Sequence, residues 1–517
     1  MAELDLLVLG SGVAGLSAAV KASVLGLRVG VLTKGELSQA TTRWAQGGVA
    51  AVLFDDPDST DLHLADTLAA GAGLCDVDAV RVLVEEGPAR VNDLIALGAV
   101  FDRDPGGALA LAREGGHSFA RVVHAGGAAT GAEIERALVA AVHSTAASLM
   151  ERWFAVDVIV ENGSCRGVVA LDPVGARHEI RATHTLMASG GAGQLYAVTT
   201  NPPEATGDGM AMAVRAGVPV ADLEFVQFHP TALHHPSVPR PLLSEALRGH
   251  GALIRDVNGQ QFVDELAPRD VVARAMAGRM LDKGVDHLWL DTTPIEGFEV
   301  RFPTIAAALR RAGLDPATEW LPIAPAAHYM IGGVVTDLDG ATALPGLWAA
   351  GEVAATGVHG ANRLGSNSLL EGMVFAARVV EAVAGGKDSP DATGLMRSVH
   401  TSRSTSREYP PMGAIPRSEP GVGGEPRKAR EGLQQEMSAH AGLLRDANSL
   451  AQAQAAADSV PEAPATDAVG GWELSNLGAV ARALTAAATL REETRGAHNR
   501  RDFPERSEAL ERHIVIA

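Results

Sequence analysis

The chain has 517 residues, 46% of them hydrophobic, which is more than one compact core usually holds. Its 43 basic and 62 acidic side chains give a net charge of -19, which argues against nucleic-acid binding. The two cysteines match no metal or redox spacing, and neither a charged leader nor an uncharged stretch of about 18 residues occurs. We therefore expect a soluble cytoplasmic protein of two or three domains, with no metal site and no nucleic-acid or membrane partner.

The chain opens with two apolar runs separated by a glycine-rich turn. Residues 4–9 predict a buried strand, and Gly10-Ser11-Gly12-Val13-Ala14-Gly15 predicts a tight turn into a helix over residues 16–26. Residues 28–34 predict a parallel strand, so backbone N–H groups at the helix start can bind a pyrophosphate. That strand ends in Thr33-Lys34, where a dinucleotide site more often places an acid, and this departure argues most strongly against a nicotinamide cofactor.

Strands and Ala-rich helices continue to about residue 222. Helices are predicted over residues 61–72 and 79–97, and strands over residues 155–160 and 167–170. This alternation is typical of an α/β nucleotide-binding domain with a doubly wound, Rossmann-like sheet.

The composition changes twice after this region. Residues 223–329 are rich in His, Pro and Arg, which predicts an inserted α+β capping domain over the substrate. The nucleotide-binding domain, residues 1–222, then resumes over residues 330–388 and is discontinuous. Residues 389–517 predict a C-terminal helical domain, with helices over 427–458 and 472–495 after an exposed connection through Gly424.

Two segments of the resumed domain carry candidate functional groups. Residues 347–352 predict a short buried strand that ends at Glu352. Residues 186–193 predict a similar strand earlier in the chain, but no acid follows it. Glu352 is a candidate acid for the ribityl or ribose oxygens of a flavin cofactor, although it could instead serve a helix start. The loop from His359 to Glu371 places Arg363 among glycines, asparagines and serines, a composition suited to binding a small anion beside a cofactor.

Seven motifs in one order make the chain resemble a known flavoprotein family. This family comprises L-aspartate oxidase and the flavoprotein subunits of succinate dehydrogenase and fumarate reductase. The resemblance covers nearly the whole chain and implies an FAD-dependent oxidoreductase. The motifs are Ala-Gln-Gly-Gly at 45–48, Gly-Asp-Gly at 207–209, Phe-His-Pro-Thr at 228–231, Pro-Arg-Asp at 268–270, Ala-His-Tyr at 327–329, His-Gly-Ala-Asn-Arg-Leu-Gly-Ser-Asn-Ser-Leu at 359–369 and Arg-Gly-Ala-His at 495–498.

Three features favour the aspartate-oxidising branch of this family. Residues 39–46 lack the histidine that bonds covalently to FAD in the respiratory members, so the resemblance implies non-covalent FAD. Residues 242–249 look like the aspartate oxidase version of that segment. Arg113-Glu114-Gly115-Gly116-His117, with Arg121 and His124 beyond it, is similar to the segment that offers a glutamate to the substrate ammonium.

The resemblance implies oxidation of L-aspartate to iminoaspartate by hydride transfer from Cα to flavin N5. Dioxygen, giving hydrogen peroxide, or fumarate would reoxidise the flavin, and quinolinate synthase would be the functional partner in quinolinate and NAD biosynthesis. An arginine fork suits a carboxylate because it can donate two parallel hydrogen bonds. The implied catalytic residues are Glu114, His229, Arg269, His328 and Arg363, and Ser244 and Ser366 join them in binding substrate.

The implied cofactor-binding residues extend from the first glycine turn to the Arg363 loop. They are Ser11, Gly12, Val13, Ala14, Gly15, Lys34, Thr41, Thr42, Ala45, Gln46, Gly47, Gly48, Val156, Asp208, Glu352, Ser368 and Leu369.

Several alternatives remain open from the sequence. Ser244 could cap the helix that begins at Glu245 instead of binding substrate. Arg269 could act as a base, or it could mainly clamp substrate during oxidation and donate a proton only toward fumarate. The chain could also be a soluble fumarate reductase or succinate dehydrogenase-type flavoprotein, an electron-transfer subunit docked on an iron–sulfur protein, or a flavin-binding module without catalysis. Aspartate-dependent flavin bleaching distinguishes the first hypothesis from these.

Overall fold

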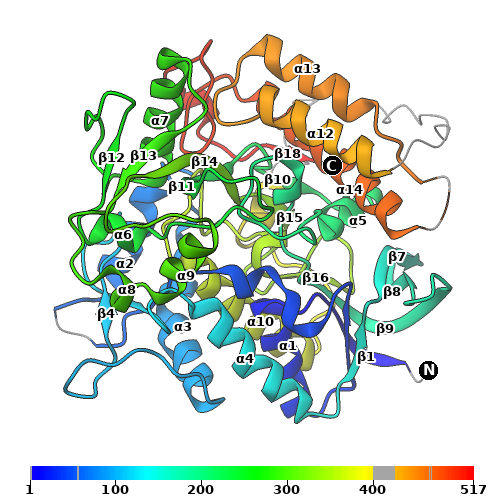
Figure 1. Ribbon diagram of the computed structural model, residues 1–517. Helices are drawn as coiled ribbons and strands as arrows, with labels where there is room; N and C mark the ends of the chain where they lie inside the picture. The colour runs from blue at the N-terminus through cyan, green and yellow to red at the C-terminus, as the bar shows by residue number, and fades with distance from the viewer. Residues whose placement is uncertain (1–2, 55–56, 400–425, 465, 467) are drawn as a thin grey trace.

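The computed structural model describes residues 3–54, 57–399, 426–464, 466 and 468–517. A seven-stranded sheet has the order β6-β2-β1-β9-β8-β7, with β16 beside β9. Figure 1 labels five of these strands, β1, β7, β8, β9 and β16. The pairs β1/β2, β1/β9, β2/β6 and β9/β16 are parallel, whereas β7/β8 and β8/β9 are antiparallel. The strands are β1 (Leu4–Leu9), β2 (Val29–Thr33), β6 (Ser148–Glu151), β7 (Phe154–Glu161), β8 (Ser164–Leu171), β9 (Arg177–Met187) and β16 (Leu347–Ala349).

Both faces of the parallel part of this sheet are buried. Leu6 and Val8 pack into one apolar cluster with α1, whereas Leu7 and Leu9 pack into the cluster on the other face. Because side chains alternate along a strand, this division confirms the doubly wound α/β class predicted from the sequence. The helices of this region are α1 (Val13–Val24), α2 (Thr60–Ala70), α3 (Val77–Ala96), α4 (Thr130–His143), α5 (Asp208–Arg215) and α10 (Asn367–Ala384).

Two small sheets flank this region. One has the order β17-β15-β10-β18 and joins the end of the chain to the first half of the fold. The other has the order β3-β5-β4. Their strands are β3 (Val49–Ala50), β4 (Leu111–Ala112), β5 (Val122–Val123), β10 (Val220–Ala221), β15 (Gly333–Val335), β17 (Ala354–Ala355) and β18 (Val515–Ile516).

The inserted segment forms an antiparallel sheet with helices, as its composition predicted. Its strand order is β11-β14-β13-β12, and its own apolar cluster includes Leu233, Leu288 and Ile323. We call this sheet the cap sheet. The elements are β11 (Val226–Leu233), β12 (Leu253–Arg255), β13 (Leu288–Asp291), β14 (Leu321–Met330), α6 (Glu245–Gly249), α7 (Arg269–Lys283), α8 (Phe298–Arg301) and α9 (Pro303–Arg311).

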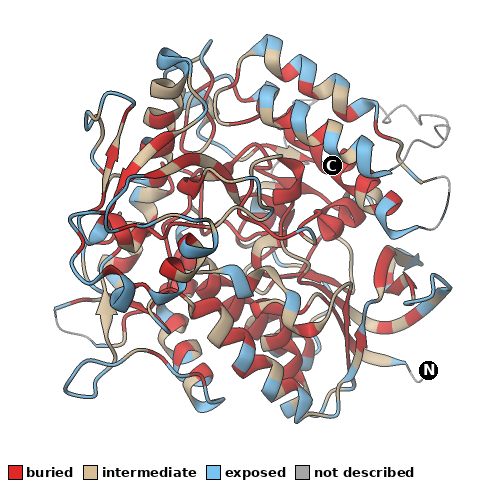
Figure 2. Ribbon diagram, in the orientation of Figure 1, coloured by how far each residue is buried: buried red, intermediate tan, exposed pale blue. Residues whose placement is uncertain are grey.

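Three helices of the C-terminal region lie together in Figure 1: α12 (Pro426–His440), α13 (Ala447–Asp458) and α14 (Val469–Leu490). The helical character predicted over residues 427–458 is confirmed, and the structure divides this stretch into α12 and α13. Asp446 caps α13 by accepting a hydrogen bond from the Ser449 N–H at 2.9 Å, and Arg445 donates to the Ala441 and Gly442 carbonyls. Figure 2 shows the outer surfaces of α12 and α13 exposed and the interior buried.

The predicted exposed connection through Gly424 is wrong over its first part. Leu395, Met396 and Val399 are buried and pack in one cluster with Val335 and Ala355. Their apolar side chains make this segment part of the folded core. Residues 400–425 of the same prediction lie outside the described residues.

Glu135 predicts a measurable pH dependence of stability. This α4 residue is 3% exposed; one carboxyl oxygen accepts the Ala40 N–H at 3.1 Å, and the other has no partner among the residues that the structure describes. Burial raises the pKa of Glu135 to about 7, against the opposing effects of Ala40 and Arg43. The folded state therefore holds this proton more tightly than the unfolded state, and stability is lost as pH rises toward 7.

We expect Glu135→Gln to match the wild type near pH 5 and to be more stable at pH 8. The gain should be on the order of 2 kcal/mol, because each pKa unit corresponds to about 1.36 kcal/mol and local relaxation offsets part of it. The measurement is the difference in melting temperature between variant and wild type from pH 5 to 8.5. Glu133→Gln on the same helix is the control, since Arg136 lowers the pKa of Glu133. A pH-independent difference for Glu135→Gln would contradict the prediction.

Candidate active site

One cleft connects the glycine turn after β1 with the cap sheet. It holds about 1730 Å³ of empty space including its open mouth, and its lining extends from the glycine turn to the histidines of the cap sheet. Its walls come from β1, β2, β11, β14, α7 and the loops before α10. This size suits a dinucleotide lying end to end with a small substrate.

The glycine turn forms one end of the cleft. Gly10 has φ +113°, and a Cβ at this position would lie 2.3 Å from the Ala188 carbonyl oxygen. A Cβ at Gly15 would lie 2.1 Å from the Gly10 carbonyl oxygen, so only glycine lets α1 approach β1 this closely. Gly12 is the N-cap of α1 without a side-chain cap, and it lines the cleft. The positive end of α1 therefore faces a space suited to a pyrophosphate.

Lys34 and Asp208 meet at the side of this end. The Lys34 ammonium lies 2.8 Å from an Asp208 carboxylate oxygen and 2.8 Å from an oxygen of Glu473 on α14. Burial alone would raise the pKa of Asp208, but Lys34 holds it below its usual range. The helix α14 thus holds Lys34 in place through Glu473, and the start of α5 places an acid, Asp208, beside the end of β2.

Other predicted groups also face this part of the cleft. Thr42 accepts a hydrogen bond from the Val13 N–H at 2.9 Å, and the buried side-chain oxygen of Gln46 has no partner in the described residues. A Glu352 carboxyl oxygen accepts the Met330 N–H at 2.9 Å, and burial raises the pKa of Glu352 to about 7. An unpaired acceptor and a carboxyl beside the cleft fit the hydroxyl and amide donors of a flavin dinucleotide.

Two buried arginines meet at the other end of the cleft. Arg363 and Arg269 both donate to the side-chain oxygen of Gln227, at 2.9 Å and 3.3 Å. Arg363 also donates to Ser368 at 2.7 Å and lies 4.3 Å from the centre of the Tyr329 ring. Burial and the charge of Arg269 lower the pKa of Arg363 to about 10, so it remains a cation at neutral pH. The pair provides two guanidinium forks for an anionic ligand.

Two histidines line the cleft beside the arginines. His229 on β11 and His328 on β14 have ring centroids 5.2 Å apart. Burial, together with the arginine charges, holds the pKa of each imidazole well below its usual value, so both are neutral. The Thr231 N–H donates to His229 Nδ1 at 3.3 Å, which leaves the Nε2–H of His229 free to donate.

Glu114 brings one negative charge into this cationic end. Its carboxylate accepts a hydrogen bond from Ser366 at 2.7 Å, and an oxygen lies 3.1 Å from His124 Nε2. Burial would raise the pKa of Glu114, but His124 and Arg269 outweigh it and lower the pKa to about 2. Ser366 has φ +62°, a costly left-handed conformation for a serine, and it directs this hydroxyl at the carboxylate.

The structure brings nearly all predicted site residues to this cleft. Gly15 packs behind it, and Val156 lies outside the lining whereas its neighbour Ala155 is part of it. Ser244 both lines the cleft and caps α6 by accepting from the Ala246 N–H at 3.3 Å. Arg121 is buried among Asp58 and Asp66 instead of lining the cleft.

Three residues of this end were not singled out from the sequence. They are Gln227, Tyr329 and Glu245, which accepts from Arg269 Nε at 2.7 Å. Each lies next to a predicted site residue or motif in the sequence, and this position is the feature by which the sequence could have identified it. The site combines two guanidinium groups, two neutral imidazoles and the carboxylates of Glu114 and Glu245, the second of which is paired with Arg269. Its donors suit a small molecule with two carboxylates, and Glu114 suits one ammonium.

Comparisons with known proteins agree with this arrangement. A family model described as an FAD binding domain matches residues 5–369, and one for the C-terminal region of the fumarate reductase flavoprotein matches residues 430–516. Over 542 residues the chain is 48% identical to an L-aspartate oxidase from Streptomyces coelicolor, covering 99% of this chain and 91% of that one. Identity to an L-aspartate oxidase from Mycobacterium tuberculosis is 44% over 526 residues, covering 99% and 95%.

A solved quinol-fumarate reductase with menaquinol molecules is similar with a TM-score of 0.85 and 30% identity, covering 98% of this chain and 94% of that one. Among the described residues, no helix has both the length and the apolar character needed to cross a membrane.

Proposed function

The chain belongs to the L-aspartate oxidase family of FAD-dependent oxidoreductases, and from this premise we propose that it oxidises L-aspartate to iminoaspartate. The matches over nearly its full length confirm the predicted flavoenzyme class and the FAD cofactor. The observation that carries the proposal is Glu114 lying among Arg269, Arg363, His229 and His328 in one cleft. This pattern pairs each charge of aspartate with an opposite charge or a donor.

FAD, when bound, supplies the two-electron acceptor that takes a hydride from substrate Cα at N5. Its isoalloxazine end would be held near Gln46, Gly47 and Leu369, and its phosphates at the start of α1. Residues 39–46 contain no histidine, so we propose that the cofactor is held without a covalent bond there. The remaining predicted cofactor-binding residues would complete this cradle.

The protein's own groups hold the substrate. Arg363 and Arg269 bind its carboxylates, and the neutral His229 and His328 donate hydrogen bonds to the same oxygens. Binding both carboxylates of the substrate holds the Cα–H bond in one direction. Most of the rate gain from positioning would come from this orientation. Oxidation removes a hydride from Cα, which the flavin would accept, and a proton from the ammonium group, which would pass to solvent water.

Glu114 binds the ammonium group and does not act as a base. A carboxylate whose pKa is about 2 is a poor proton acceptor near neutral pH. Arg269, at the start of α7, is also a poor base during oxidation of the amino acid, because a guanidinium is already protonated. We propose that it clamps substrate in this direction and acts as a proton donor only toward fumarate.

We further propose that dioxygen, giving hydrogen peroxide, or fumarate reoxidises the enzyme. The product would then supply a quinolinate synthase in NAD biosynthesis. The domain bounds proposed for this activity are residues 1–222 and 330–388 for FAD binding, 223–329 for the cap and 389–517 for the C-terminal helices.

Anaerobic mixing of the purified yellow protein with L-aspartate, D-aspartate or succinate tests this function. Bleaching of the flavin absorbance by L-aspartate alone is expected. No bleaching by L-aspartate, together with reoxidation of the reduced flavin by fumarate, would instead identify a soluble fumarate reductase. The similarity to the solved fumarate reductase makes this the second candidate.

Tyr329 offers a test of how the substrate clamp is positioned. Its ring packs against Arg363, and its hydroxyl donates to Glu371 at 2.9 Å. A cation–π contact contributes about 0.5–2 kcal/mol, so Tyr329→Leu should raise KM for L-aspartate roughly 2- to 30-fold. Tyr329→Phe keeps the ring and should stay near the wild-type KM. Steady-state kinetics that show equal impairment of both variants would contradict this role of the ring.

A further inference from the structure

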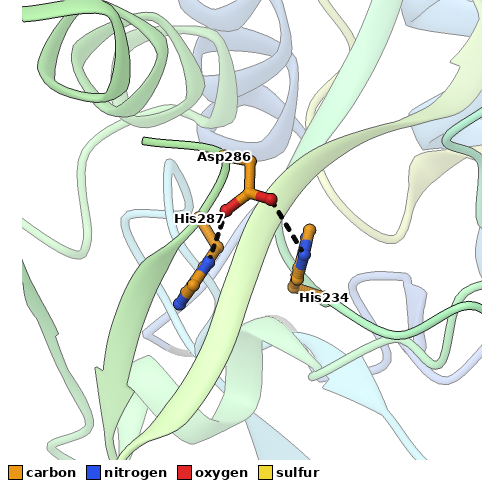
Figure 3. Close-up of side chains that lie close together, drawn as sticks. All are labelled: His234, Asp286 and His287. Atoms are coloured by element: carbon orange, nitrogen blue, oxygen red, sulfur yellow. Dashed lines mark hydrogen bonds and ion pairs between the residues drawn. The ribbon is translucent and has the colours of Figure 1, made fainter. Parts of the chain in front are cut away.

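A cluster of two histidines and one aspartate lies on the cap sheet outside the cleft. Figure 3 shows the Asp286 carboxylate between the imidazoles of His234 and His287. Asp286 Oδ1 lies 2.7 Å from His287 Nδ1, and Oδ2 lies 3.6 Å from His234 Nε2. None of the three residues lines the cleft, so the established family function does not account for their convergence.

The sheet register brings these residues together from distant parts of the sequence. Leu233 on β11 and Leu288 on β13 both pair with Ile323 of the intervening strand β14. Both leucines point into the apolar core, so the adjacent His234 and His287 fall on the opposite face by strand alternation. The two imidazoles are stacked across β14 with centroids 4.9 Å apart.

The spacing of the three groups suits a transition-metal ion. One ligand atom from each residue lies within 4.8 Å of the other two. Zinc–nitrogen and zinc–oxygen bonds of about 2.0–2.1 Å place neighbouring tetrahedral ligands about 3.3 Å apart. This value lies between the two separations from Asp286, 2.7 Å to His287 and 3.6 Å to His234. The side chains of His234 and His287 are 36% and 30% exposed, so small rotations can close the site and solvent can supply the remaining ligand.

The charge of the cluster also leaves its ligand atoms available. Each imidazole offers one ring nitrogen to a metal ion, and the Asp286 carboxylate lies between the two rings. Arg240 lies close enough to act on His234 electrostatically. Arg240 opposes an added cation, and the Asp286 carboxylate offsets that repulsion.

A second cluster, made of three aspartates, differs because a lysine of the protein neutralises its charge. Asp337, Asp339 and Asp391 also converge, but the Lys387 ammonium lies 2.7–2.8 Å from all three carboxylates. The ammonium already fills the position that a metal ion would take. No lysine or arginine ion pair to Asp286 occurs among the described residues.

We propose that His234, Asp286 and His287 form a binding site for one divalent transition-metal ion of the zinc class, with water completing its coordination. Two imidazoles and a carboxylate favour such an ion over magnesium or calcium, which prefer oxygen ligands. The ion ties the end of β11 to the start of β13 across β14. Since β11 and β14 also carry His229 and His328, it stabilises the sheet that covers the substrate.

Zinc calorimetry on the full-length, flavin-loaded protein after EDTA treatment and desalting tests the site. One Zn²⁺ per chain is expected to bind and to raise the melting temperature. His234→Ala, His287→Ala and Asp286→Asn should each weaken binding about tenfold or more, since even changes around metal ligands cost that much. His178→Ala is the matched control, because His178 pairs with a single carboxylate, Asp172, at 2.8 Å.

Loss of affinity only in the three cluster variants supports the site. Absence of saturable zinc binding, or equal binding by wild type and cluster variants, would overturn it. Electron paramagnetic resonance of the Cu²⁺-loaded wild type gives a readout independent of any variant. Coupling to two imidazole nitrogens is expected, and coupling to none or one contradicts the proposal. The two thiols do not compete near neutral pH, because burial raises the pKa of Cys75 to about 12 and also raises that of Cys165.

Discussion

Replacing Arg363 by leucine should lower kcat/KM for L-aspartate about 10³-fold while FAD remains bound. Arg363 is 5% exposed and holds its fork in place through Gln227, Ser368 and Tyr329. Without the guanidinium, a substrate carboxylate would be buried without its partner. Breaking a buried ion pair from one side costs about 3–5 kcal/mol, and each 1.4 kcal/mol is a factor of ten.

Single-turnover flavin reduction separates this effect from loss of cofactor, because the flavin content of the variant is read from the same spectrum. Arg363→Lys keeps the charge but not the planar fork, so it should recover only part of the rate. Arg482→Leu is a matched control, since Arg482 is also buried but donates to the Ala457 and Val460 carbonyls in the C-terminal region. A kcat/KM within tenfold of wild type for Arg363→Leu would refute the clamp.

The glycine turn and the first strands could be predicted because their causes are local. Leu6 through Leu9 form a continuous apolar strand, and Gly10 and Gly15 permit the close approach of α1. Pattern and backbone constraint act within a few residues of one another there. The start of the cap segment also has a local signal, because the amino-acid composition changes there.

The contacts within the site could not be predicted in this way. Arg363 donates a hydrogen bond to Gln227, which is 136 positions away in the sequence, and Lys34 donates one to Glu473, which is 439 positions away. Such pairs depend on how distant elements pack, and no local periodicity encodes that. The break between α12 and α13 escaped prediction for a related reason, since alanine-rich periodicity continues past the point where Asp446 starts a new helix.

Metal ligation illustrates the same limit. His234 and His287 are 53 positions apart, and the intervening sequence has no metal-binding spacing. They converge only because β11 and β13 pair with the same residue of β14. The sequence analysis predicted no metal site because the cysteine spacing matches no metal-binding motif. Such motifs cannot reveal a site whose ligands are brought together by the register of a sheet.

Glu114→Gln should separate recognition of the substrate ammonium from recognition of its carboxylates. We expect kcat/KM for L-aspartate to fall about 10²-fold, because a buried charge pair broken from one side costs roughly 2–5 kcal/mol. Fumarate has two carboxylates but no ammonium, so its reduction by the pre-reduced enzyme should change less than about threefold. Glutamine is close in shape to glutamate and can still accept the Ser366 hydrogen bond, so the pocket should keep its form.

The pH dependence of this effect follows from the low pKa of Glu114, about 2. A depressed carboxyl pKa keeps the group ionised throughout the range from pH 5 to 9, and its favourable charge is lost only as pH falls toward 2. The ratio of wild-type to Glu114→Gln activity on L-aspartate should therefore stay constant across that range. Stopped-flow flavin reduction at each pH measures it. Equal losses for aspartate and fumarate would show that Glu114 shapes the pocket generally, through Ser366 and His124, and would remove the basis for selecting an amino acid over a simple dicarboxylate.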